Sequence, residues 1–340
     1  MEPENSTLAS GLNTQWVECT VSLDEKARKV VVFLLYLFIF VVGLIENLIV
    51  VWVNWRKRHA KESVSFYILN MAIADLVLIL TVPFWIMDVV LEHVWLWGRF
   101  LCKFIYFIYL VDMFSSVFFL TCMTIERYRL MVLPTQASST NQERNRKIIC
   151  GCIWVLAIVL SVPENIHVDL MVWEDAGCFY MPPLDTYETW VVVTTFLTVF
   201  AGFFIPFPII LILNILIARA IKSNSNLKSQ KSYKILYAYV IAFIVCWLPR
   251  HMIIFLIGVD EVLWSHSCNV AIVLYYLYSI VECISLLHCV LNPILYNFLS
   301  KGFRNNLLRS VVRFVPKEHL TNKKAKESST SSTRHSVVIT

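Results

Sequence analysis

Charged residues are scarce in this chain: only 16% of its 340 residues are Asp, Glu, Lys or Arg, whereas 58% are hydrophobic. A water-soluble domain carries about a quarter charged residues, so the scarcity excludes such a domain and predicts a membrane protein. The sequence also lacks repeats and an inverted similarity between its halves, which argues against many transporter folds. It lacks a nucleophile paired with a base at an accessible site, so we expect no enzyme. No nucleic-acid partner is expected either.

Long apolar runs, in contrast, are plentiful. The first 29 residues lack the apolar core of a cleavable signal, so we expect the first apolar run to direct the chain to the membrane. The predicted fold class is an all-α membrane protein, a bundle of seven transmembrane helices over residues 30–299. The stretches that approach or meet a bilayer-spanning length run approximately from Val30 to Val53, Val64 to Val90, Phe100 to Ile125, Ile148 to Val162, Trp190 to Ile217, Ile235 to Gly258 and Val270 to Leu299.

The two sides of this bundle differ in charge. Lys and Arg gather after the first, third, fifth and seventh stretches, and segments rich in these residues stay in the cytoplasm. This predicts a multi-pass plasma-membrane protein with an extracellular N-terminus. The outer segments instead carry many carboxylates, including Glu25, Glu92 and Asp169, and an acidic face attracts cationic partners. Asn5 begins a glycosylation sequon on the same side.

Both ends of the chain flank the bundle. Residues 1–29 are predicted to be an acidic extracellular segment. Residues 300–315 place apolar and basic side chains at helical spacing, which predicts a short amphipathic eighth helix lying on the lipid of the inner leaflet. Residues 316–340 are rich in Ser and Thr, and we expect a disordered cytoplasmic tail that is phosphorylated.

Polar side chains inside an apolar span are costly, so each one is a functional candidate. Asp75 lies in the second stretch, and Asp112 and Ser116 lie one turn apart in the third. Asn292 lies in the seventh stretch, which also holds Glu282 and His288. Several of these groups can meet in the interior of one bundle.

Prolines interrupt two of the spans. Pro249 ends the motif "CWLP" beside Trp247, and Pro293 lies in "NPILY". A proline removes a backbone hydrogen bond and kinks its helix, which can then pivot. We expect Asn292 and water to satisfy the carbonyl groups that Pro293 leaves without a partner.

Four of the ten cysteines, Cys19, Cys102, Cys178 and Cys268, fall in predicted outer segments. Four cysteines allow three pairings, and the residues alone do not choose among them. A metal site is the weaker interpretation, because His266 beside Cys268 offers too few ligands for a closed tetrahedral shell. We therefore expect no metal centre on this side.

The chain carries Asn47, Asp75, Glu126-Arg127-Tyr128, Trp154, "CWLP" and "NPILY". Together they form a set of motifs that resembles the rhodopsin-like G-protein-coupled receptors. It occurs in the order and on the helices of that family, over essentially all of residues 30–314. Further features resemble the chemokine receptor branch, including its atypical members: "TVPFW" from Thr81, "WLWG" from Trp95, Glu282, "HCVLNPILY" and the four outer cysteines.

This resemblance implies two disulfides, Cys102 with Cys178 and Cys19 with Cys268. It also implies that the ligands are chemokines or other basic peptides. A retinal ligand is set aside because no lysine lies between Lys234 and Lys301 to form a Schiff base. Candidate ligand-binding residues are Trp85, Tyr109, Arg250, His251, Tyr278 and Glu282.

Glu282 has two interpretations. A buried carboxylate could receive a cationic group from the flexible end of the ligand, or it could form an internal pair with Arg250, because an unpaired charge at that depth is costly. We expect the contact with ligand.

The resemblance also suggests an ion. Asp75, Ser116 and Asn292 match the residues that hold sodium in the inactive state of such receptors, and Asp112 adds a second carboxylate. Two carboxylates this close could share a proton instead. No other cofactor is expected.

The inner end carries the predicted activation switch. In the family, the acidic neighbour holds the arginine of the triplet at rest, so we expect Glu126 to hold Arg127. The family also supplies a helix-five tyrosine to steady the released arginine, whereas this chain has Asn214 there, or Leu216 in a second alignment. Arg129 also departs from the family pattern, which has a leucine at this position. The predicted switch residues are Glu126, Arg127, Tyr128, Asn214, Trp247, Pro249, Pro293 and Tyr296.

An amide cannot replace a phenol, so we expect weak or absent G-protein activation. The predicted function is an atypical scavenger that captures chemokines, enters endosomes and uses arrestin or another endocytic adaptor. One alternative is a peptide-hormone or chemokine receptor that signals through a G protein. A second is an ion or proton transporter that uses the intramembrane carboxylates as a relay.

Overall fold

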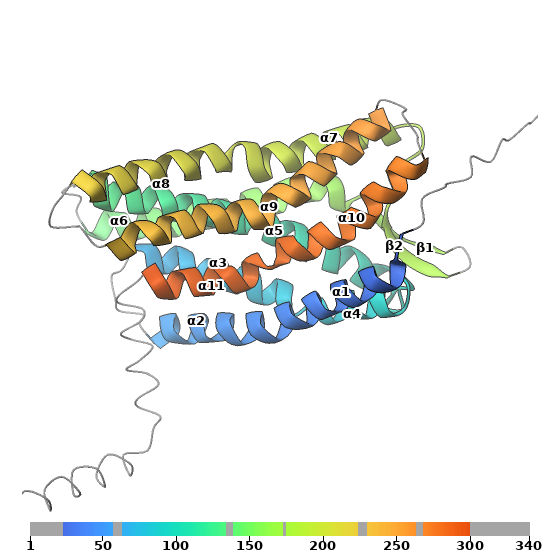
Figure 1. Cartoon of the computed structure of the whole chain (residues 1–340), viewed down its shortest axis with the longest axis horizontal. Coiled ribbons are helices and arrows are strands. Elements are labelled where there is room, and N and C mark those ends of the chain that lie inside the picture. The colour runs from blue at the N-terminus through green and yellow to red at the C-terminus, as the bar shows by residue number, and fades with distance from the viewer. Residues whose placement is uncertain are drawn as a thin grey trace, which may run out of the picture.

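The computed structural model describes residues 23–56, 63–133, 139–172, 175–223, 230–262 and 268–299. Within these residues, seven helical segments are long and apolar enough to cross a membrane, and they lie lengthwise beside one another (Figure 1). The predicted seven-helix bundle is therefore confirmed. The segments are Glu25–Asn54, Phe66–Val90, Gly98–Val132, Gln142–Asn165, Tyr187–Ser223, Leu236–Val262 and Asn269–Leu295.

Four of the seven segments are built from more than one helix, and the other three are single helices that extend beyond the apolar run at both ends. The fourth was expected to end at Val162, but its helix continues through Pro163 to Asn165. The elements in chain order are α1 (Glu25–Phe38), η1 (Ile39–Gly43, a π-helix), α2 (Leu44–Arg56), α3 (Ser63–Ile79), α4 (Val82–Val90), α5 (Gly98–Val132), α6 (Ser139–Asn165), β1 (Val168–Val172), β2 (Ala176–Tyr180), α7 (Tyr187–Val199), η2 (Phe200–Phe204, a π-helix), α8 (Pro206–Ser223), α9 (Gln230–Val262), α10 (Cys268–Leu286) and α11 (His288–Leu299).

The first helix begins earlier than its apolar run. Asp24 accepts a hydrogen bond from the backbone N–H of Ala27 at 2.9 Å, which caps the helix N-terminus. The next turn adds an ion pair between Glu25 and Arg28 at 2.6 Å. Residues 25–29 therefore belong to α1, whereas the sequence placed them in the outer segment.

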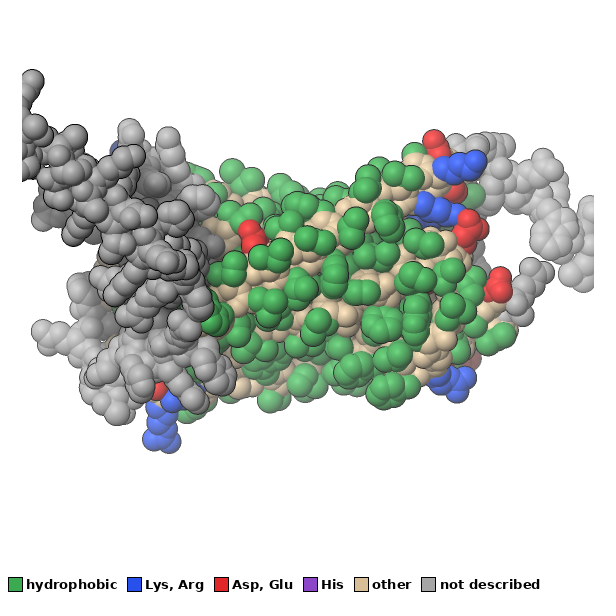
Figure 2. All heavy atoms as spheres, turned by 90° about the horizontal axis from the view of Figure 1, so that it is seen from below, with side chains coloured by type: hydrophobic (Ala, Val, Ile, Leu, Met, Phe, Trp, Pro, Cys, Tyr) green, Lys and Arg blue, Asp and Glu red, His purple; other side chains and the backbone are tan. Residues whose placement is uncertain are grey.

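Helix α5 lies at the centre of the bundle. In the most apolar part of this helix 72% of the residues are buried, whereas the same share is at most 33% in the other six described spans. The outer helices instead turn large apolar side chains outward, and Figure 2 shows these covering the middle of one face, with most of the charged side chains toward the two ends. Polar residues on α5 are consequently interior residues, whereas the band between the ends suits contact with lipid.

A residue of the first span donates the hydrogen bond that Pro293 in the last described helix cannot donate. Pro293 has no N–H, so the carbonyl of Cys289, four residues earlier, receives no helical hydrogen bond from it. The Asn47 side chain donates to this carbonyl at 2.8 Å and to that of Gly43 at 2.9 Å. The expectation that Asn292 and water would do this is therefore corrected, since Asn47 in α2 does it.

A two-stranded antiparallel hairpin lies at the end of the bundle where α1 begins (Figure 1). Its strand β2 is joined to α5 by a disulfide between Cys102 and Cys178, as predicted. The backbone N–H of Trp95 also donates to the Ala176 carbonyl at 2.6 Å. The hairpin is thus fixed over this end of the bundle.

Several predictions fall outside the part of the chain that the structure describes. They concern Asn5, the pairing of Cys19 with the side chain of Cys268, the side chain of Tyr296, the amphipathic helix at 300–315 and the tail at 316–340.

Close packing of α7 on α9 depends on Gly258. A methyl group added there would lie 2.7 Å from Thr195 Oγ1 and 2.8 Å from its Cγ2, and a β-branched side chain cannot turn away easily. Overpacking of this kind costs about 1–3 kcal/mol. We expect Gly258→Ala to lower the melting temperature of the purified protein by about 3 °C or more. Gly151→Ala is the matched control, because nothing lies within 4 Å of its added methyl group, and an equal loss in both variants would contradict the packing argument.

Candidate functional site

A cavity of about 740 Å³ opens between the helices beneath the hairpin. Three of the predicted ligand-binding residues, Trp85, Tyr278 and Glu282, line it. Its walls come from α1, α4, α5, α6, β2, α7, α9 and α10, so residues far apart in sequence converge there. A volume of this size suits a peptide segment or a small molecule.

Two carboxylates stand inside the cavity, and hydroxyl groups donate hydrogen bonds to both of them. Glu282 accepts a hydrogen bond from the Tyr278 phenol at 3.3 Å. Glu164 accepts from the Tyr106 phenol at 2.9 Å and from Thr198 Oγ1 at 3.3 Å. Within the described residues, no ion pair within 4.0 Å includes either carboxylate. Both groups are therefore placed to accept hydrogen bonds from a cation.

Glu164 was not among the predicted site residues. The apolar run ended at Val162, whereas the helix continues and brings Glu164 into the bundle. A carboxylate directly after an apolar run and a proline was the signal that could have identified it.

The rim of the cavity is mixed in charge. Arg28 lines it, but Glu25 on the same helix pairs with it at 2.6 Å. His93 lies 2.8 Å from Asp88 in the same way. Tyr180 from β2 completes this wall, and burial raises its pKa to about 12, so the phenol stays neutral at physiological pH. Each basic group on the rim thus has an acidic neighbour, and the unpaired carboxylates lie deeper.

The other three predicted ligand residues lie beneath the cavity and do not line it. Arg250 is fully buried, and its guanidinium donates to the Tyr109 phenol at 2.6 Å and to Met113 Sδ at 2.9 Å. His251 Nδ1 lies 2.7 Å from the Trp247 carbonyl, and its Nε2 faces Gly202. The alternative pairing of Glu282 with Arg250 is not formed at ion-pair distance in the described structure, because Tyr109 takes Arg250 instead.

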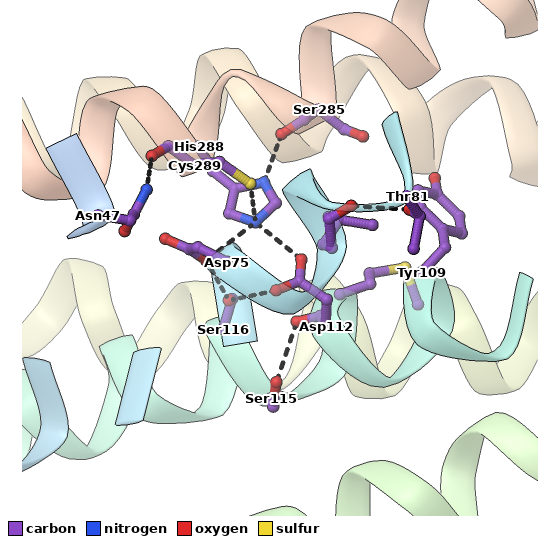
Figure 3. Close-up of polar contacts among 12 residues, drawn as sticks. Asn47, Asp75, Thr81, Tyr109, Asp112, Ser115, Ser116, Ser285, His288 and Cys289 are labelled. Atoms are coloured by element: carbon purple, nitrogen blue, oxygen red, sulfur yellow. Dashed lines mark hydrogen bonds and ion pairs between the residues drawn. The ribbon is translucent and has the colours of Figure 1, made fainter. Parts of the chain in front are cut away.

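A second polar cluster lies deeper in the bundle (Figure 3). Ser116 donates to Asp75 at 3.1 Å and lies 3.4 Å from Asp112, which brings together three of the four residues predicted for an ion or proton site. The fourth, Asn292, is also buried. The structure adds His288 at the start of α11, whose Nε2 lies 3.0 Å from Asp112 and 3.7 Å from Asp75.

The inner switch differs from the expected arrangement. Glu126 pairs with Arg146 of α6 at 3.0 Å and with Arg129 at 3.8 Å, and within the described residues no ion pair joins it to Arg127. Arg127 instead lies over the Tyr239 ring, 4.5 Å from its centroid, and donates to the Tyr239 hydroxyl at 3.1 Å. The expectation that Glu126 holds Arg127 is therefore corrected.

The phenol near the arginine comes from a different helix than the family pattern suggests. Asn214 of α8 is buried and donates to the Ile210 carbonyl of its own helix at 2.7 Å. Tyr239 of α9 was not identified from sequence, although it lies ten residues before Pro249 in an apolar helix. Of the other predicted switch residues, Tyr128 packs against the cluster that contains Ile217, and Trp247 is buried in the main core of the bundle.

Comparisons with known proteins agree with this architecture. The family model "7 transmembrane receptor (rhodopsin family)" matches residues 46–296. The chain is 42% identical to human G-protein coupled receptor 182 over 95% of this chain and 80% of that protein. It is 33% identical to human atypical chemokine receptor 3 over 84% of this chain and 81% of that protein. It is 30% identical to C-X-C chemokine receptor type 4-A of Xenopus laevis over 92% of this chain and 88% of that protein.

The likeness to G-protein coupled receptor 182 was also expected from "VGLIENLIVVWVNWR", "FYILNMAIADL" and "HCVLNPILYNFLS". These relatives are receptors and not enzymes. The seven spans, the family model and the relatives together place this chain in the rhodopsin family of seven-transmembrane receptors.

Proposed function

We propose that this receptor captures chemokines at its outer cavity and removes them by endocytosis, with little activation of G proteins. Its similarity to an atypical chemokine receptor and to a C-X-C chemokine receptor supports the ligand class. The contact between Arg127 and Tyr239 is the observation that carries the scavenging role.

The outer cavity supports binding of a cationic group. Chemokines are small basic proteins, and their flexible end could enter a space of about 740 Å³. Glu164 and Glu282 would accept charge-assisted hydrogen bonds there, which are about twice as strong as neutral ones. Tyr106, Tyr278 and Thr198 hold these carboxylates now through neutral hydroxyl groups. Those hydroxyl groups can remain as second donors when a cation arrives.

The inner end supports weak signalling. In receptors of this family, activation moves helix six outward and frees the arginine of the triplet. The sixth span of this chain is α9, and Tyr239 on this helix contacts Arg127. The arginine is therefore held by the same helix that would have to move. A desolvated cation–π contact contributes about 2 kcal/mol, and outward movement of α9 would break it. Asn214 bonds its own helix and supplies no replacement.

The remaining parts of the proposal concern the cell. The receptor would reside in the plasma membrane with a glycosylated Asn5 outside, and its basic 300–315 segment would contact lipid. A phosphorylated tail would recruit arrestin or another endocytic adaptor and carry the loaded receptor into endosomes.

A chemokine receptor that signals through a G protein is the second candidate. It is favoured by the presence of Arg127 and of the helix prolines Pro249 and Pro293. The similarity to a C-X-C chemokine receptor also agrees with it.

Uptake of a labelled chemokine panel by cells that express this chain distinguishes the two candidates. We expect uptake of at least one chemokine without nucleotide exchange on any co-expressed G protein. Cells that express a signalling chemokine receptor at equal surface density serve as the positive control for exchange. Strong exchange driven by a bound chemokine would contradict the scavenging role, and uptake of none would contradict the ligand class.

A further inference from the structure

We propose that the His288 side chain is the built-in cation of the pocket formed by Asp75 and Asp112, so that this receptor excludes the sodium ion that its family motif implies. The proposal concerns the deep cluster alone and does not depend on the ligand class or the scavenging role.

The hydrogen bonds of the imidazole indicate its charge. Nδ1 of His288 lies 2.6 Å from the backbone carbonyl of Ser285, and a carbonyl oxygen only accepts, so Nδ1 carries a hydrogen. Nε2 lies 3.0 Å from an oxygen of Asp112, an acceptor when ionised. An imidazole that donates from both nitrogens is a cation. His288 thus suits a position between two acceptors (Figure 3).

Charge balance leads to the same assignment. Asp75 and Asp112 are 0% and 2% exposed, and two buried carboxylates without a cation would be very costly. An imidazolium compensates one of the two negative charges, and a proton on the carboxylate pair would compensate the other. In the described part of the chain, His288 is the basic side chain within 4.0 Å of either aspartate, and no Lys or Arg pairs with them. The buried guanidinium of Arg250 is bonded to Tyr109.

The groups around the imidazole leave it little freedom. Asp112 and Ser116 face it from α5, and Asp75 faces it from α3. Cys289 Sγ lies 3.5 Å from Nε2, and the Trp247 ring of α9 lies 4.8 Å from the His288 ring. A further titratable side chain on α9, Cys246, is buried nearby and is a thiol. The pocket therefore holds its cation between three helices.

These residues do not fit a sodium ion. An ion bound by the two aspartate oxygens that face His288 would lie close to Nε2, which is 3.7 Å from the oxygen of Asp75 and 3.0 Å from that of Asp112. The ion would also meet a donor N–H and its positive charge. The adjoining cavity measures about 10 Å³ and is lined by His288 and Asn292, but by neither aspartate. Sodium would have to displace the imidazole to bind both carboxylates.

Removing the imidazole should therefore create a sodium site. In a His288→Asn receptor the oxygens of Asp75 and Asp112 would face a smaller neutral amide. The Oδ2 atom of Asp75, which has no hydrogen-bond partner in the described structure, would be free to bind an ion. The variant would thus gain a response that the natural receptor lacks.

The test compares melting temperatures of purified receptor in lipid nanodiscs in NaCl and in KCl at equal ionic strength. We expect no difference for the natural receptor and a saturable rise of about 3 °C or more in NaCl for His288→Asn. His251→Asn is the matched control, because this buried histidine contacts the Trp247 carbonyl and neither aspartate, and it should stay insensitive.

Two results would overturn the proposal. Saturable stabilisation of the natural receptor by sodium but not by potassium would show that the pocket accepts the ion, and this measurement needs no variant to fold. A folded His288→Asn receptor that remains insensitive to sodium would show that something other than the imidazole excludes the ion. His288→Gln provides a second neutral replacement if the asparagine variant does not fold.

Discussion

Replacing Glu164 and Glu282 together by glutamine is expected to lower the affinity of the receptor for basic chemokines by about a hundredfold or more. Each carboxylate would accept a hydrogen bond from a cationic group, and such a bond to a charged partner contributes about 1.5–3 kcal/mol. Because 1.4 kcal/mol corresponds to a factor of ten, each single variant should lose about tenfold or more. Glutamine keeps the shape of glutamate and removes the charge.

Equilibrium binding of a labelled chemokine to the variants, at matched surface expression, measures this effect. Glu92→Gln is the matched control, because Glu92 is an exposed outer glutamate that pairs with Lys29 and does not line the cavity. We expect the control to change affinity by less than about twofold. If the double variant bound as tightly as the natural receptor, the two carboxylates would have only a structural role.

Tyr239→Leu is expected to raise G-protein activation, because it removes the contact that joins Arg127 to α9. A loss of about 2 kcal/mol would shift the balance between the closed and open inner ends by about thirtyfold. Tyr239→Phe keeps the ring over the guanidinium but loses the hydroxyl, so its effect should be smaller. Adding Asn214→Tyr to Tyr239→Leu would supply a phenol on α8 and should increase activation further.

Nucleotide exchange on a co-expressed G protein, with and without chemokine, checks this prediction. Tyr237→Leu is the control, because Tyr237 lies two residues away on α9 but is 58% exposed on the outer face of the helix. An unchanged exchange rate in Tyr239→Leu at normal surface density would mean that the contact does not restrain the receptor.

The sequence predicted those features that depend on hydropathy and on position along one helix. Seven apolar runs identified the spans, and the spacing of Asp112 and Ser116 placed them on one face of α5 near Asp75. It did not identify Glu164, because an apolar run shows where hydrophobic residues stop and not where a helix stops.

Other features depend on how neighbouring helices are rotated, which no single helix encodes. Arg250 and His251 follow a helix proline and were expected in the outer cavity, but the rotation of α9 directs them into the packed interior. The same rotation brings Tyr239 over Arg127, a contact between residues more than a hundred positions apart. Such contacts depend on how α9 is rotated relative to α5.

The amide of Asn47 has a consequence for biogenesis. Its acceptor is the carbonyl of Cys289, in the last of the seven described spans to be synthesised, whereas Asn47 itself lies in the first. A chain made from its N-terminus therefore inserts this donor into lipid long before the acceptor emerges from the ribosome. Closure of the ring of helices must wait for the final span, and a chain truncated before residue 289 would leave the Asn47 amide with the Gly43 carbonyl of its own span but without its acceptor in the last span.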